Sequence, residues 1–170
     1  MIRDYLPIPL IPAAWALTFA TLVYPGIDTY WIQHMNIFIT GFLALFGALS
    51  WKAMDGEVLQ TWRNIIALGF VFTGLGTLGF FVESYNTLLF GSSILYWFLA
   101  PAAGFKITSE LMEEGSELYL NLAWLSLPAA ACFIAAYAVQ SPELTAISLV
   151  SIAAIQTASI VDASRRDHDW

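Results

Sequence analysis

Charged residues and cysteine are scarce in this chain of 170 residues. Asp, Glu, Lys and Arg make up 11% of it, and the one cysteine is Cys132. A single cysteine excludes an intramolecular disulfide, a CxxC motif and a cysteine metal cluster. The Lys and Arg residues number only six, too few for the basic patch that nucleic acid requires. We therefore expect no nucleic-acid partner.

The middle of each long apolar run also lacks charge. Charge inside hydrocarbon marks ion paths and proton relays, so a pump built on a buried carboxylate is not expected. The two histidines are His34, at the end of a run, and His168, in the C-terminal tail. They provide no axial ligands for a haem in the membrane and no base beside Ser92 or Ser93. We expect no catalytic residue, no metal, no cofactor and no enzymatic activity.

Apolar residues dominate what is present: they make up 59% of the chain, and the mean hydropathy is +0.71. A transmembrane helix needs about 20 apolar residues to cross about 30 Å of hydrocarbon. Six runs approach this length, which leaves little chain for a soluble domain. The sequence predicts an all-α polytopic membrane protein with a single six-helix transmembrane domain over residues 1–170. The predicted spans are about 8–24, 35–51, 64–83, 92–107, 118–139 and 144–161.

The basic residues predict the orientation of these spans. All six fall on one side of the membrane when the six runs cross it in turn: Arg3, Lys52, Arg63, Lys106, Arg165 and Arg166. Cytoplasmic loops are enriched in Lys and Arg, so both termini are expected in the cytoplasm and the chain in the plasma membrane. The protein is acidic, with 13 Asp and Glu and a net charge of −7, but acidic residues contribute little to orientation.

Small residues recur at helical spacing in two of the runs. The third run carries Gly69, Thr73, Gly76 and Thr77, and the sixth carries Ser151, Ala154 and Ala158. Small faces let membrane helices approach closely. We expect these faces to pack within one bundle or between subunits.

Neutral polar and aromatic side chains take the place of charge inside the runs. The polar set includes Thr18, Thr40, Thr73, Thr77 and Gln156, and the aromatic set includes Trp15, Phe72, Tyr96 and Trp97. A neutral lining with a hydrophobic constriction selects small neutral or weakly acidic solutes. In the alternative interpretation, the hydroxyls bond back to their own helices and the rings fill the core.

The N-terminal segment carries a family resemblance. Leu6-Pro7-Ile8-Pro9-Leu10, followed by Trp15 and Thr18, resembles the opening of the acetate/succinate uptake (YaaH-type) transporters. The resemblance implies a homo-hexamer in which each protomer has its own narrow pore, pinched by an aromatic of the first span, an aromatic of the third and a leucine of the fifth.

Carried over by position, the three pinching residues are Trp15, Leu68 and Leu127, and Thr18 matches a threonine of the family. The family has Tyr where this chain has Leu68, so Phe72, one turn later, is the alternative. The segment Met35–Gly41 is also similar to the start of the second span in acid-gated urea channels.

Three hypotheses follow for the function. The first is a channel or facilitative transporter for a small neutral or weakly acidic solute such as acetate, with urea or an amide as the alternative solute. The second is an accessory subunit of a larger membrane complex, without transport of its own. The third is an intramembrane enzyme acting on lipid, for which Glu83 and His34 are the polar groups expected at one membrane face.

Overall fold

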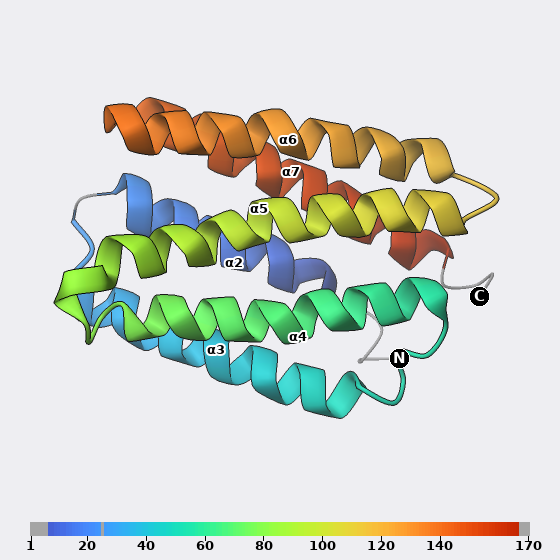
Figure 1. Cartoon of the computed structure of the whole chain (residues 1–170), viewed down its shortest axis with the longest axis horizontal. Coiled ribbons are helices and arrows are strands. Elements are labelled where there is room, and N and C mark those ends of the chain that lie inside the picture. Colours follow the sequence, from blue (N-terminus) through green and yellow to red (C-terminus); the bar gives the residue numbers. More distant parts are fainter. Residues whose placement is uncertain (1–6, 25, 167–170) are drawn as a thin grey trace. The chain divides into compact units, whose positions relative to one another are not determined.

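The computed structural model describes residues 7–24 and 26–166, and all regular structure in these ranges is helical (Figure 1). Leu6 of the proline-rich motif, Arg3 and His168 lie outside the described residues. The described helices are α2 (Pro7–Val23), α3 (Thr29–Ser50), α4 (Glu57–Leu78), the short 3₁₀ helix η1 (Glu83–Tyr85), α5 (Asn86–Leu111), α6 (Ser116–Val139) and α7 (Pro142–Arg166). The expectation of an all-α chain is confirmed for these residues.

Five of the described helices are long and apolar enough to cross a membrane: α3, α4, α5 with its preceding 3₁₀ turn, α6 and α7. The first predicted span is also a helix, but its apolar described part, Ile11–Val23, is shorter. The chain therefore has the helices of a multi-pass membrane protein.

Several helices extend beyond the apolar runs into polar sequence. α3 begins at Thr29 rather than at 35, because Asp28 caps it by accepting a 2.8 Å hydrogen bond from the backbone N–H of Tyr30. α4 begins at Glu57 rather than at 64, and an acidic first turn favours a helix start. Between them Gly56 has a φ of 104°, a conformation open to glycine. Hydropathy marks the part of the chain that is suited to hydrocarbon, whereas the Asp28 cap and the acidic first turn favour the earlier starts of α3 and α4.

The chain divides into two compact units. Unit 1 comprises Met1–Gly26 and Trp124–Trp170, and contains α2, α7 and most of α6. Unit 2 comprises Ile27–Ala123, and contains α3, α4, η1, α5 and the start of α6. In unit 1, α2 packs against α7; in unit 2, α4 packs against both α3 and α5 (Figure 1).

Glycines bring α4 and α5 together in unit 2. A Cβ at Gly69 of α4 would lie 2.5 Å from the Trp97 ring of α5, and one at Gly76 would lie 2.8 Å from Ser93. Both distances are shorter than van der Waals contact. The small face of the third run is therefore confirmed as a packing face within one unit.

The small face of the sixth run has a different environment. Ala154 and Ala158 of α7 are exposed, and the buried face of this helix carries Ser148, Ile152 and Gln156 instead.

We expect Gly69→Ala to destabilise the protein by about 1–3 kcal/mol, because the added methyl must displace the Trp97 ring. Gly91→Ala is the matched control: it lies on α5, and nothing lies within 4 Å of its added Cβ, so higher helix propensity should leave stability unchanged or raised. Thermal unfolding in detergent compares the two variants. Equal midpoints would contradict close packing at Gly69.

Candidate functional site

In unit 1 the expected pore residue Trp15 is a hydrogen-bonded packing residue. Its ring is 7% exposed, and its indole N–H donates a 2.8 Å hydrogen bond to the side-chain oxygen of Gln156, which is 5% exposed. The bond joins α2 to α7. The hydroxyl of Thr18, one turn along α2, donates to the backbone oxygen of Ala14 at 2.9 Å. Leu127 of α6 is 44% exposed.

In unit 2 two further indoles bond across the α4–α5 pair. The Trp97 N–H of α5 donates to the hydroxyl oxygen of Thr73 of α4 at 3.0 Å. The Trp62 N–H of α4 donates to the hydroxyl oxygen of Thr108 of α5 at 3.1 Å. A buried indole needs a hydrogen-bond acceptor, so each bond satisfies a polar group and holds two helices together.

Hydroxyls join α3 to α4 as well. The hydroxyl oxygens of Thr40 and Thr77 are 2.8 Å apart, and the Thr77 hydroxyl also lies 3.2 Å from the side-chain oxygen of Asn36. Each threonine further approaches the backbone oxygen four residues earlier in its own helix. These contacts match the interpretation in which hydroxyls bond within and between helices.

The remaining expected site residues also lie in unit 2. The Phe72 ring stacks on the Tyr96 ring with centroids 4.5 Å apart, and the Tyr96 hydroxyl donates to the backbone oxygen of Ile65 at 2.6 Å. Leu68 is 54% exposed. The five expected residues are thus divided: Trp15, Thr18 and Leu127 belong to unit 1, and Leu68 and Phe72 to unit 2.

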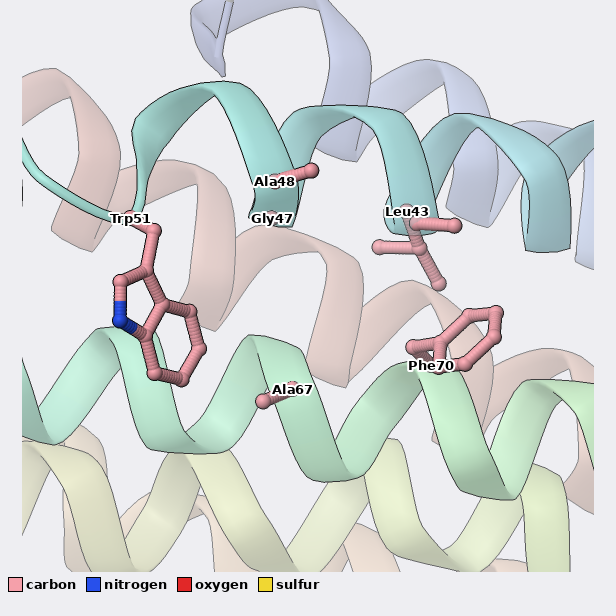
Figure 2. A pocket seen from close by; sticks show the side chains of 7 residues that line it. Leu43, Gly47, Ala48, Trp51, Ala67 and Phe70 are labelled. Carbon is pink, nitrogen blue, oxygen red and sulfur yellow. The ribbon is translucent and has the colours of Figure 1, made fainter.

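A hollow of about 220 Å³ lies between α3 and α4 (Figure 2). Its apolar walls include Leu43, Gly47, Ala48 and Trp51 of α3, and Ala67 and Phe70 of α4. Figure 2 shows the Leu43 and Trp51 side chains projecting from α3 toward α4 at the two ends of the hollow. We call this hollow the α3–α4 groove.

Arg63 of α4 packs against Trp51, one of the residues that line the α3–α4 groove. Its guanidinium carbon lies 4.7 Å from the centroid of the Trp51 ring, within the range of a cation–π contact. Its Nη1 donates to the backbone oxygens of Trp51 and Met54, at 3.2 and 3.3 Å. A cation at the C-terminal end of a helix satisfies carbonyls that lack helical partners. Arg63 therefore holds the α3–α4 connection against the start of α4.

The polar groups considered for lipid chemistry are not paired in the described residues. The Nδ1 of His34 lies 2.7 Å from the backbone oxygen of Tyr30, and its ring packs on the Tyr30 ring with centroids 4.0 Å apart. Within ranges 7–24 and 26–166, no ion pair joins His34 to Glu83, and no group of three or more metal-ligating side chains occurs.

Comparisons with protein-family models, with curated proteins and with solved structures found no match. The resemblance to acetate and urea transport families thus stays a prediction based on the motif residues.

Sequence reasoning missed four features: the Trp15–Gln156 pair, the Trp97–Thr73 pair, the Trp62–Thr108 pair and the α3–α4 groove. A signal was present for Trp15 and Trp97, since an indole inside an apolar run requires a hydrogen-bond acceptor. Trp62 and Thr108 lie outside the predicted runs and gave no such signal. The groove had no such signal, because it depends on how two helices pack.

We expect Trp15→Phe and Gln156→Leu each to lower stability by about 1–3 kcal/mol, because each leaves a buried polar group without this partner. The double variant should lose less than the sum of the two, which a double-mutant cycle measures. Trp124→Phe is the control, since Trp124 is 62% exposed. Additive losses would contradict a direct Trp15–Gln156 interaction.

Proposed function

We propose that the chain is a structural, non-enzymatic subunit of a larger membrane assembly. The proposal rests on one observation: the neutral polar side chains form hydrogen bonds between helices. The indoles of Trp15, Trp62 and Trp97 each bond to a side chain of a neighbouring helix. Groups held in this way stabilise a bundle, whereas a solute pore needs polar groups directed into a passage.

The proposed orientation places both termini in the cytoplasm and the protein in the plasma membrane. Its support is the distribution of Lys and Arg in the sequence. In this orientation the loop between α3 and α4, with Lys52, faces the cytoplasm, and so does the end of α5, where Lys106 pairs with Glu110.

The second candidate is a facilitator for a small solute such as acetate or urea, working as a homo-oligomer of the hexameric type that the resemblance implies. Its support is the N-terminal motif, in which Thr18 matches a threonine of the transport family and Trp15 is the aromatic at the first pinching position. Neutral donors and acceptors of this kind suit an uncharged or weakly acidic solute.

One preparation separates the two candidates. The full chain is purified from its native membrane in mild detergent, its subunits are identified by native mass spectrometry, and the sample is reconstituted for uptake of labelled acetate and urea. We expect a stoichiometric partner of different sequence and uptake no faster than into empty liposomes. A lone ring of this chain with saturable uptake would overturn the subunit proposal in favour of the facilitator.

The variant Trp15→Phe tests the facilitator candidate directly. In a facilitator that uses the indole N–H, this variant changes the uptake rate while the ring stays intact. Trp124→Phe, at an exposed indole, is the control and should leave uptake unchanged.

A further inference from the structure

The α3–α4 groove opens on a helix that has little protein cover. None of the residues in the most apolar 18-residue window of α3 is buried. A Cβ built at Gly47, in the wall of the groove, would meet no atom within 4 Å. The groove is therefore open at this glycine.

The size and lining of the groove suit a hydrocarbon chain. Its volume of about 220 Å³ is below the about 300–1,000 Å³ typical of sites for drug-sized molecules. From Leu43 to Trp51 it follows α3 for about 12 Å at 1.5 Å per residue. A narrow apolar space along a transmembrane helix matches the shape of one lipid tail.

Two cationic residues lie next to Trp51, where the groove reaches the end of α3. Lys52 follows Trp51 directly and is exposed, and the Arg63 guanidinium packs on the Trp51 ring. Neither side chain forms an ion pair within the described ranges. The Nε of Arg63 is buried, so Lys52 is the more accessible of the two cations.

Two acidic residues lie in the same connection. One carboxylate oxygen of Asp55 accepts hydrogen bonds from the backbone N–H of Gly56 at 3.1 Å and from the side chain of Gln60 at 3.3 Å. Glu57 lies in the first turn of α4, where the helix dipole stabilises a negative charge. Asp55 thus has a role in the turn and Glu57 at the helix start.

We propose that the α3–α4 groove binds a phospholipid, with one hydrocarbon tail between α3 and α4 and the phosphate beside Lys52 and Arg63. Basic groups between transmembrane helices at the membrane surface recognise lipid phosphate, and Trp51 directly follows the last residue of the apolar helix α3, a position where indoles are enriched in membrane helices. The proposal requires only that this helix pair lies in a bilayer, so it is independent of the subunit and facilitator proposals.

Two glycines of α3 give a matched test of the tail site. Gly47 and Gly41 both have open space at an added Cβ, but only Gly47 lines the groove. The full-length variants Gly47→Leu and Gly41→Leu are purified from nanodiscs containing phosphatidylglycerol, and the bound lipid is counted by native mass spectrometry. We expect Gly47→Leu to weaken retention on the order of tenfold, since its side chain fills the apolar space, and Gly41→Leu to match the parent protein.

The headgroup is tested separately with Lys52→Gln, which leaves the Arg63 contacts in place. Removing one cation near a membrane surface should weaken the free energy of phosphatidylglycerol binding by about 1 kcal/mol, which is about fivefold in affinity. Lys106→Gln, which removes a cation that is already paired with Glu110, is the control. Phosphatidylcholine should bind as a second phosphate source, whereas a neutral galactosyl diacylglycerol, which has no phosphate, should not be retained.

Three results would overturn the proposal. Equal lipid retention by Gly47→Leu and Gly41→Leu would show that the groove holds no tail. Equal retention of the phosphate-free lipid would exclude phosphate recognition at Lys52 and Arg63. A change of oligomeric state in Gly47→Leu alone, with lipid retention unchanged, would assign the groove to a second copy of the chain.

Discussion

The constraint on which the rest of the structure depends is the absence of water from hydrocarbon, where a polar group must find its partner inside the protein. The indole of Trp15 bonds to Gln156, and the indole of Trp97 bonds to Thr73. Since each bond joins two helices, the groups that are costly to bury also determine which helices pair. The same bonds make the neutral polar side chains poor evidence for a pore.

Within unit 2 the two faces of α4 differ in their physical character. Toward α5, Gly69 and Gly76 allow backbone and rings to approach closely, so the interface is tight. Toward α3, small residues such as Ala67 face Gly47 and Ala48 across the α3–α4 groove. At the end of this interface Arg63 bonds to the carbonyls that end α3. Helix α4 therefore packs closely against α5 on one face, and on the other face it borders the open, apolar α3–α4 groove.

The sequence predicted the helical, membrane-type fold and the packing role of Gly69, because hydropathy and small-residue spacing report locally on what a helix contacts. It was less successful with helix ends, since Asp28 and Glu57 extend α3 and α4 into polar sequence through capping and the helix dipole. For the expected site, the family resemblance named Trp15, and Phe72 as the alternative to Leu68, as pore residues. It did not give the partners Gln156 and Tyr96 that they have in the structure.

By itself, then, the sequence determined the class of fold, because long apolar runs in a chain with 11% charged residues have one stable arrangement, the hydrogen-bonded helix in lipid. Only the tertiary structure decided to which acceptor each indole N–H donates its hydrogen bond, on which face of α4 the close contacts lie, and where the α3–α4 groove forms. Those features depend on distances between residues far apart in the chain. Periodicity along a single helix reports the face that a residue occupies, but not the side chain that lies opposite.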